Sequence, residues 1–413
     1  MKASIITIGD ELLIGQTIDT NSAWMGAELS KAGFDVHRIT SIHDRRQDII
    51  NVIDESAGKT DVVLITGGLG PTSDDITKQT LCEFFNTRLV VNKEVLSLIE
   101  EMLKRRNFKM NDNNRRQAEV PESCRVLKNE TGTAPGMWFE KDGTIFISMP
   151  GVPHEMKHIM TERVLPELHK RFTSQVIIHR NIMTYGEFEA RLAELLFGFE
   201  EGLPDNIKLA YLPANGIIKL RLTGTGTENE FLSNQITDQV NKLYKIIPAI
   251  IYGENEESLE MVIGNLLRNK NSFVSTAESC TGGEIARKLT SIPGSSTYFK
   301  GSVIAYDNQI KAQLLKVKTG TLEKEGAVSK STVTEMALGA KSIFNTEFAV
   351  ATSGIAGPGG GSEDKPVGTL WIAVASEKGV VTEKKVFGND RNTKIQRFSI
   401  AALNLLRKQI IND

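Results

Sequence analysis

The sequence predicts an α/β protein built from three successive domains. Residues 1–170 alternate short β-branched runs with amphipathic stretches, a pattern typical of a parallel sheet wrapped by helices. A similar pattern of strands and helices starts anew at residue 253, after a segment of different character. A chain of 413 residues is also too long for one ordinary core. We therefore expect domains at 1–170, 171–252 and 253–413.

Strands and helices are expected to alternate through the first domain. The expected strands are 5–8, 36–40 and 62–66, and the expected helices are 24–32, 49–57 and 76–85. Ligands of open α/β sheets collect at the C-terminal ends of the strands. The loops after Ile8 and Thr66 are therefore the expected ligand-binding loops, and both are rich in glycine and acidic residues.

The middle segment is expected to form a small α+β module, with a strand at 217–223 and a helix at 230–245. The third domain is expected to open with an amphipathic helix at 256–268. Its further expected strands are 272–277, 298–306, 348–352, 370–375 and 380–387, and its further helices are 283–290, 331–344 and one from about residue 393.

Composition favours a globular enzyme of the cytoplasm. The chain has 40% apolar and 24% charged residues with a net charge of −2, which gives no reason to expect binding to nucleic acid or to an anionic membrane. No apolar run is long enough to span a membrane, and no signal peptide is evident at the N-terminus. Three widely spaced cysteines argue against a disulfide framework and a structural zinc site.

Residues 276–283, with the sequence TAESCTGG, place Ser279 where an expected strand stops and an expected helix starts. Unpaired N–H groups at a helix start favour an anionic oxygen, either a phosphate or a developing oxyanion. The alternative is that Ser279 or Thr281 is only the N-cap of the helix, because serine and threonine are preferred there.

Further polar loops follow Ser279. The glycine-rich residues 353–361 come after an expected strand and are able to cradle a phosphate, although a flexible connector is the alternative. Tyr306 and Lys311 lie at the exit from another strand. A lysine whose pKa is lowered by burial can take the proton of a serine hydroxyl, whereas most lysines are solvated.

The two ligand loops of the first domain carry carboxylates. Asp10 and Glu11 follow the first strand, and Asp74 and Asp75 end a loop with the sequence TGGLGPTSDD. Glycine amides bind phosphates while carboxylates bind a hard divalent cation, so the pair of loops suits a diphosphate. The alternative is that Asp74 and Asp75 only favour the start of the following helix.

The motifs TAESCTGG, PGSSTYFKGSVIAYDNQIK, SGIAGPGGGSEDKPVGT and GNDR together resemble the C-terminal domain of the CinA family. The resemblance implies an amidase that hydrolyses nicotinamide mononucleotide (NMN) to nicotinic acid mononucleotide and ammonia, without a cofactor. It implies Ser279 as nucleophile, with Lys311 and Tyr306 activating it. Cys280 is a rival nucleophile, but its side chain should point away from that of Ser279. The implied substrate contacts are Thr281, Gly282, Gly283, Gly294, Ser295, Ser296, Ser353, Gly354, Gly357 and Arg391.

The motifs GDELLIGQTIDTNSAWMGAELSKAG, TGGLGPTSDDIT, NRRQAEVPE, GTAPG and MPGVPHEM are similar to the N-terminal domain of the same family, which is a molybdopterin-binding-like fold of three α/β layers. The resemblance implies a metal-dependent ADP-ribose pyrophosphatase that uses Mg²⁺ or Co²⁺. The implied metal ligands are Asp10, Glu11, Asp74 and Asp75, with Gly67, Gly68, Gly70 and Thr72 near the diphosphate.

A molybdopterin ligand is the alternative for this domain. The family also implies a KH-like middle module and a homodimer, and its name leaves open a non-enzymatic scaffold associated with competence or DNA damage.

Overall fold

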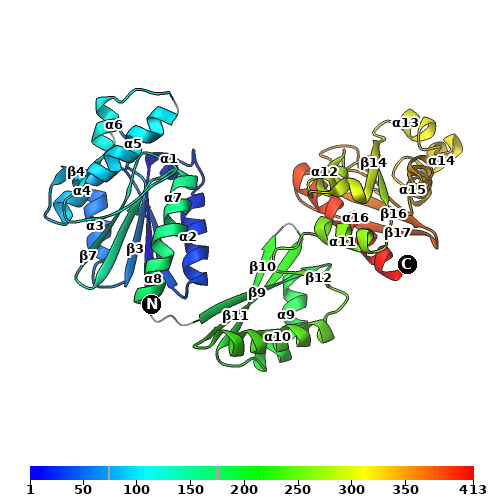
Figure 1. Ribbon diagram of the computed structural model, residues 1–413. Coiled ribbons are helices and arrows are strands. Elements are labelled where there is room, and N and C mark those ends of the chain that lie inside the picture. Colours follow the sequence, from blue (N-terminus) through cyan, green and yellow to red (C-terminus); the bar gives the residue numbers. More distant parts are fainter. Residues whose placement is uncertain (73–74, 106, 173–175, 215) are drawn as a thin grey trace. The chain divides into compact units, whose positions relative to one another are not determined.

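The computed structural model describes residues 1–72, 75–105, 107–172, 176–214 and 216–413 (Figure 1). It separates into two compact units. One comprises Met1–His179 with Gly224–Ser233, and the other comprises Arg180–Thr223 with Asn234–Asp413. The three-domain boundaries stay a prediction.

The first unit is built on a six-stranded sheet in the order β2-β1-β3-β8-β7-β6. These strands are β1 (Lys2–Ile8), β2 (Asp35–Ile42), β3 (Val62–Thr66), β6 (Arg125–Leu127), β7 (Gly136–Lys141) and β8 (Thr144–Met149). Strand β1 pairs in parallel with both β2 and β3, and β3 pairs in parallel with β8. Because β2 and β3 lie on opposite sides of β1, the C-terminal ends of β1 and β3 form the crevice where such sheets bind ligands.

Helices cover both faces of this sheet, as Figure 1 shows. On one face, α2 (Thr20–Lys31), α7 (Pro153–Ile159) and α8 (Leu165–Arg171) bury Met25, Met156 and Leu168. On the other face, α3 (Arg46–Ser56) and α4 (Thr77–Phe84) bury Ile53 and Leu81. Fully burying a side chain of this size contributes about 1.5–3 kcal/mol. The remaining elements are α1 (Asp10–Leu13), β4 (Leu89–Val91), α5 (Lys93–Arg105), α6 (Asp112–Gln117), β5 (Glu119–Pro121) and the π-helical turn Met160–Val164.

The second unit contains most of a small α+β module, together with a larger α/β portion. The module has a four-stranded sheet in the order β10-β11-β9-β12. Its elements are β9 (Val176–Tyr185), α9 (Glu189–Glu201), β10 (Ile207–Ala214), β11 (Ile217–Gly226), α10 (Asn229–Ile246) and β12 (Ile251–Glu254). Alternate residues of β11, including Leu220 and Leu222, are buried, as expected for a strand with one apolar face.

The larger portion has a five-stranded sheet in the order β14-β13-β15-β16-β17. Its strands are β13 (Val274–Glu278), β14 (Phe299–Ile304), β15 (Phe348–Gly354), β16 (Thr369–Ser376) and β17 (Gly379–Val386). Strand β13 is parallel to β14 and β15, whereas β16 is antiparallel to both of its neighbours. The loops after β13, β14, β15 and β17 therefore all leave from the same edge of the sheet.

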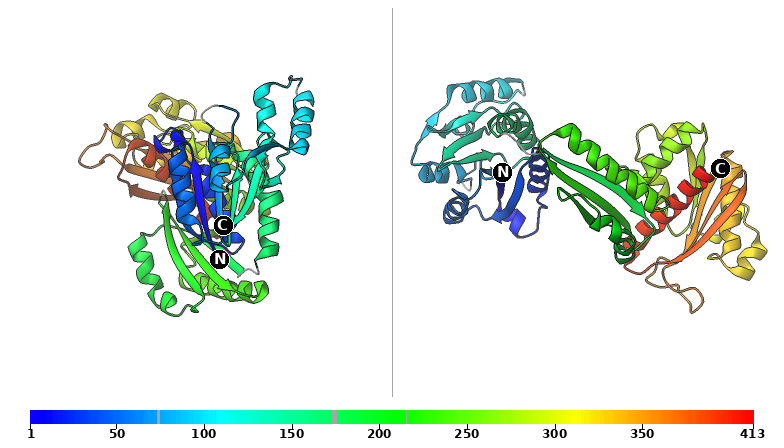
Figure 2. Two further views of the ribbon diagram at one scale, coloured as in Figure 1. Left: turned by 90° about the vertical axis from the view of Figure 1, so that its left-hand side faces the viewer. Right: turned by 90° about the horizontal axis from the view of Figure 1, so that it is seen from below.

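The two faces of this sheet are covered by different helices. On one face α15 (Lys330–Phe344) packs Met336 against small side chains such as Ala351. On the other face lie α11 (Leu259–Asn269), α12 (Glu284–Thr290) and the long α16 (Arg391–Asn412), which buries Phe398 and Leu406. Figure 2 shows α16 in red beside the sheet. Short helices α13 (Asn308–Gln313) and α14 (Thr319–Glu325) and the 3-10 turn Ser295–Thr297 complete this portion.

The predicted α/β class and the order of strands and helices are confirmed, with small shifts that have local causes. The helix expected at 256–268 begins at Leu259, because the Ser258 side chain accepts a hydrogen bond from Met261 N–H and caps it. The last helix begins at Arg391, where the Asp390 carboxylate accepts from two backbone N–H groups. Within the described part of the chain, no helix is long and apolar enough to cross a membrane.

Candidate active sites

Ser279 directly follows β13, between the ends of β14 and β15. Its N–H donates to the carbonyl of Thr352 on β15 at 3.0 Å, and the residue is 9% exposed. The N-cap of α12 is Gly283, which makes no side-chain capping bond. Neither Ser279 nor Thr281 is therefore the N-cap that was the alternative interpretation.

The start of α12 is instead satisfied by Glu278, a residue that the sequence did not single out. Its carboxylate is completely buried and accepts from the N–H groups of Gly283, Ile285 and Ala286 at 2.8–3.1 Å. It also accepts from the Thr281 hydroxyl at 2.7 Å. The sequence signal was available in the general preference for an acidic residue at a helix start.

Some of the turn residues expected to contact substrate are therefore already hydrogen-bonded within the protein. The Thr281 hydroxyl bonds to Glu278 and to the Thr352 hydroxyl. The N–H of Gly283 is bonded to Glu278. Gly282 and Gly283 have φ angles of +61° and +98°, which only glycine adopts easily, so these two positions set the path of the turn.

Lys311 is buried, which excludes the interpretation as a solvated lysine. It lies on α13, is 1% exposed, and donates from Nζ to the main-chain carbonyl of Tyr306 at 3.1 Å. Burial lowers the pKa of Lys311 from its ordinary value of 10.5, against smaller opposing effects of Asp307 and Cys280. Such an amine is more readily neutral, and therefore basic, than a solvated one.

Tyr306 is 64% exposed, and its hydroxyl is held by Arg391 rather than by Lys311. Arg391 Nη2 donates to the Tyr306 hydroxyl at 3.1 Å, and Nη1 donates to the carbonyl of Gly357. The first turn of α16 thus ties the exit of β14 to the glycine-rich loop after β15. Lys394, which the sequence did not single out, is buried in the same turn and donates to the carbonyl of Ala356 at 3.1 Å.

Two other residues of this loop have structural contacts. The Ser353 hydroxyl is buried and donates to the carbonyl of Ala327 at 2.7 Å. A Cβ at Gly354 would lie 2.5 Å from the Thr369 carbonyl oxygen and 3.1 Å from Cys280 Sγ. Cys280 itself is buried, and burial raises the pKa of its thiol to about 12.

Gly294, Ser295 and Ser296 do not join this group within one chain. They immediately precede β14, and β14 runs parallel to β13. Residues before β14 therefore lie at the opposite edge of the sheet from Ser279, which follows β13. Their substrate role stays a prediction, without support from the arrangement within one chain.

In the first unit, Asp10 and Asp75 lie on the two expected ligand-binding loops. Asp10 begins α1, and a hydrogen bond of 2.7 Å with His43 Nδ1 lowers the pKa of its carboxyl. Asp75 accepts from the N–H of Gly70 at 2.8 Å, from the N–H of Thr72 at 3.0 Å and from the Thr72 hydroxyl. Those two amides, expected near a diphosphate, are therefore occupied by Asp75. Asp74 lies outside the described residues.

Gly67 and Gly68 bring the loop after β3 close to its neighbours. A Cβ at Gly67 would lie 2.1 Å from the Ile8 carbonyl oxygen, and one at Gly68 would lie 2.1 Å from Thr77 Oγ1. Both have positive φ angles, +112° and +63°. Only glycine permits this approach between the ends of β1 and β3, so the loop after β3 begins directly against the end of β1.

A hollow of about 120 Å³ adjoins these strand ends and is lined by Glu11, Asn21, Thr66 and Gly151 among others. Asn21, not singled out in the sequence, donates from Nδ2 to the Gly151 carbonyl at 2.7 Å. Among the residues described, no three His, Cys, Asp or Glu side chains form a group able to hold a metal ion. Mg²⁺ is commonly held by one or two carboxylates together with phosphate oxygens and water, so the metal stays a prediction.

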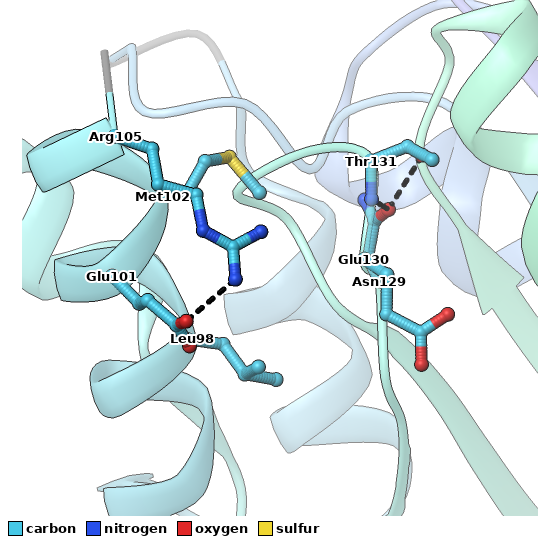
Figure 3. A pocket seen from close by; sticks show the side chains of 7 residues that line it. All are labelled: Leu98, Glu101, Met102, Arg105, Asn129, Glu130 and Thr131. Atoms are coloured by element: carbon cyan, nitrogen blue, oxygen red, sulfur yellow. Dashed lines mark hydrogen bonds and ion pairs between the residues drawn. The ribbon is translucent and has the colours of Figure 1, made fainter.

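A larger pocket of about 290 Å³ lies elsewhere in the first unit, between α5 and the turn at residues 129–131 (Figure 3). Arg105 on its wall pairs with Glu101 at 2.6 Å. Glu130 pairs with both His158 and Arg163. No predicted site residue lines it, and these charged side chains already have partners, so we assign no function to this pocket.

Two separate parts of the chain match two family models. Residues 256–410 match the CinA C-terminal domain, and residues 4–170 match the probable molybdopterin binding domain. A CinA-like protein of Flavobacterium psychrophilum is 47% identical over 418 residues, covering 100% of this chain and 99% of the relative. The chain belongs to the CinA family.

Other CinA proteins give the same result. A CinA-like protein of Cytophaga hutchinsonii is 48% identical over 408 residues, with 99% of this chain and 98% of the relative covered. The crystal structure of competence/damage inducible protein CihA from Agrobacterium tumefaciens is 41% identical with a TM-score of 0.35, covering 36% of this chain and 91% of that one. The full-length relatives confirm the suspected membership of the CinA family, and the match of residues 4–170 confirms the molybdopterin-binding-like character of the first domain.

Proposed function

We propose that the C-terminal domain is a serine amidase that hydrolyses the carboxamide of NMN to nicotinic acid mononucleotide and ammonia. The observation that carries the proposal is the burial of Lys311, whose pKa is lowered, at the edge of the sheet where Ser279 also lies. A serine needs a neighbouring base to become a nucleophile, and a desolvated lysine is such a base.

In the proposed reaction, neutral Lys311 takes the proton of the Ser279 hydroxyl as Oγ bonds to the carboxamide carbon. The tetrahedral oxyanion collapses, the C–N bond breaks, and the Lys311 ammonium returns the proton to the leaving nitrogen, which departs as ammonia. Water then attacks the acyl-enzyme ester while Lys311 takes its proton, and the acid and free Ser279 are released. These steps require no metal and no cofactor.

Tyr306 contributes through its main-chain carbonyl, which holds the Lys311 amine. The Tyr306 hydroxyl accepts from Arg391, and no hydrogen bond among the described residues joins it to Lys311 or Ser279. We therefore propose that Lys311 acts as the base and that the exposed ring of Tyr306 contacts the nucleotide.

The 5′-phosphate of the nucleotide needs a separate anchor. We assign it to Arg391 and to the loop that contains Gly357, with Lys394 beneath that loop. Arginine suits this role because its guanidinium binds phosphate oxygens with two parallel hydrogen bonds. Substrate binding would exchange the Tyr306 hydroxyl and the Gly357 carbonyl for phosphate oxygens.

Ammonia release from NMN tests this proposal. We expect release by the wild-type protein and none by Ser279→Ala or Lys311→Met. Absence of release by the wild-type protein would favour the scaffold alternative over the amidase. Size-exclusion chromatography with light scattering checks the homodimer that the family resemblance implies.

For the N-terminal domain we propose metal-dependent hydrolysis of ADP-ribose to AMP and ribose 5-phosphate. The support is the pair of carboxylates of Asp10 and Glu11, which follow β1, and the hollow at the ends of β1 and β3, which Glu11 lines together with Asn21. Mg²⁺ or Co²⁺ bound there would offset the charge of the diphosphate. A protein that binds a molybdopterin-type ligand but forms no AMP with either metal would support the alternative.

A further inference from the structure

The turn after β13 uses most of its backbone N–H groups inside the protein. The N–H of Ser279 bonds to Thr352, that of Gly282 to the Ser279 carbonyl, and that of Glu284 to the Thr281 carbonyl. The next groups, of Gly283, Ile285 and Ala286, bond to the Glu278 carboxylate. The first turn of α12 therefore has few amides left to offer a ligand.

Two N–H groups in this turn have no acceptor on another residue that the structure describes, namely those of Cys280 and Thr281. The two residues are only 6% and 2% exposed. Buried backbone N–H groups are almost always paired, because leaving one unpaired costs free energy comparable to a lost hydrogen bond. These two adjacent N–H groups lie beside the proposed nucleophile, so we expect an atom of a ligand to accept from them.

We propose that the N–H groups of Cys280 and Thr281 form the oxyanion hole, and that Glu278 is the positioning residue that sets them there. The inference deepens the proposed amidase and rests on it. It differs from the expectation that Gly283 contributes, because the N–H of Gly283 is occupied. The residue after a serine nucleophile commonly supplies such a donor.

Glu278 acts through two sets of contacts. Its carboxylate fixes the beginning of α12 through three amides and thereby fixes the far end of the turn. It also holds the hydroxyl of Thr281, which is in contact with the Thr352 hydroxyl at 2.8 Å. The peptide group between Cys280 and Thr281 is thus anchored to both β13 and β15.

Glu278→Gln tests the assignment in the full-length protein. An amide group has only one oxygen, so its NH₂ would face N–H donors at one end of the present arrangement. We expect kcat for ammonia release from NMN to fall about 100-fold, the loss typical of an impaired oxyanion hole, with KM changed by less than about threefold. The matched control is Glu284→Gln on the same helix turn, where the carboxylate pairs with exposed Arg287 and no comparable loss of kcat is expected.

A second pair of variants, at Thr281, tests the inference even if Glu278→Gln does not fold. Thr281→Val removes the hydroxyl that binds Glu278, and Thr281→Ser retains it. We expect Thr281→Val to lower kcat by about tenfold or more and Thr281→Ser to recover most of that loss. Equal effects of the two substitutions would overturn the positioning role.

Ligand binding distinguishes the loss of the oxyanion hole from a general disruption of the site. An analogue of NMN with an aldehyde in place of the carboxamide forms a hemiacetal oxyanion with Ser279, whereas the product nucleotide does not. We expect Glu278→Gln and Thr281→Val to weaken binding of the aldehyde in proportion to kcat/KM and to leave product binding unchanged. Equal weakening of both ligands, or wild-type kcat in folded Glu278→Gln, would overturn the inference.

Failure of the proposed substrate can be told apart from failure of this inference. If the wild-type protein releases no ammonia from NMN, the proposed function fails. The rate at which a fluorophosphonate labels Ser279 then reports on the oxyanion hole, because its phosphoryl oxygen occupies the same position. Slower labelling of Glu278→Gln and Thr281→Val than of the wild type supports the inference, and equal rates overturn it.

Discussion

Arg391 and Tyr306 are joined by a hydrogen bond of 3.1 Å from Nη2 to the phenol oxygen, although 85 positions separate them in the sequence. The same guanidinium reaches the Gly357 carbonyl. One side chain therefore connects three loops at the edge of the sheet that carries Ser279. Since a guanidinium presents several donors in one plane, it can exchange these two acceptors for two oxygens of a phosphate.

Arg391→Lys is expected to weaken substrate binding more than it slows the chemical step. Lysine keeps the charge but not the planar pair of donors, so we expect KM for NMN to rise about 10-fold or more while kcat changes little, since one charge-assisted hydrogen bond contributes about 1.5–3 kcal/mol. Steady-state ammonia release measures both constants. Arg287→Lys, at an exposed pair with Glu284, is the control. A fall in kcat at unchanged KM would contradict a phosphate-binding role.

The pH dependence of the amidase is expected to follow Lys311. Burial lowers its pKa below 10.5, and only the neutral amine accepts the proton of Ser279. Rate should therefore increase with pH as the amine deprotonates and level off above its lowered pKa. The measurement is a profile of kcat against pH, in which we expect the rate to rise with an apparent pKa below 10.5, the ordinary value of lysine. An acid limb that persists in Lys311→Met with residual activity would contradict the assignment.

The same shift predicts a stability effect. Between the lowered pKa of folded Lys311 and its ordinary value of 10.5, the unfolded chain binds more protons than the folded one. The free energy of unfolding should therefore rise with pH across that window. Lys311→Met should flatten this slope in urea or thermal unfolding of the second unit. Lys78, whose pKa is lowered to about 8, is present in both proteins and does not affect the difference.

The sequence predicted the position of Ser279 and Lys311 because both follow expected strands, and parallel strands end at one edge of a sheet. It did not predict Glu278, since a single acidic residue at the end of a strand does not reveal which helix amides its carboxylate meets. Lys394 was missed because the path of the glycine-rich loop over α16 depends on tertiary packing. The resemblance names Ser295 and Ser296 as substrate contacts, and the sequence did not show that within one chain they lie before β14, at the edge of the sheet opposite Ser279.

Cys280 is expected to be dispensable. Its thiol is buried and has a pKa raised to about 12 by that burial, so it is protonated at neutral pH and a poor nucleophile. Cys280→Ala should keep most of the amidase activity, whereas Ser279→Ala should abolish it. Alkylation of the folded protein by iodoacetamide, followed by mass spectrometry, should leave Cys280 unmodified. If activity survives in Ser279→Ala and is lost in Cys280→Ala, the Cys280 thiol and not the Ser279 hydroxyl is the nucleophile.

Asp75 is expected to act on the glycine-rich loop of the first unit rather than only on a metal. Its carboxylate accepts from the N–H groups of Gly70 and Thr72 and from the Thr72 hydroxyl. Asp75→Ala leaves these donors without their acceptor, so the contacts that hold Gly70 and Thr72 in place are lost. Hydrolysis of ADP-ribose should therefore be lost at every Mg²⁺ or Co²⁺ concentration, whereas ammonia release from NMN by the other unit should be retained. If saturating metal restores the hydrolysis, the main role of Asp75 is to bind the metal. The conformation of the glycine-rich loop then does not depend on Asp75.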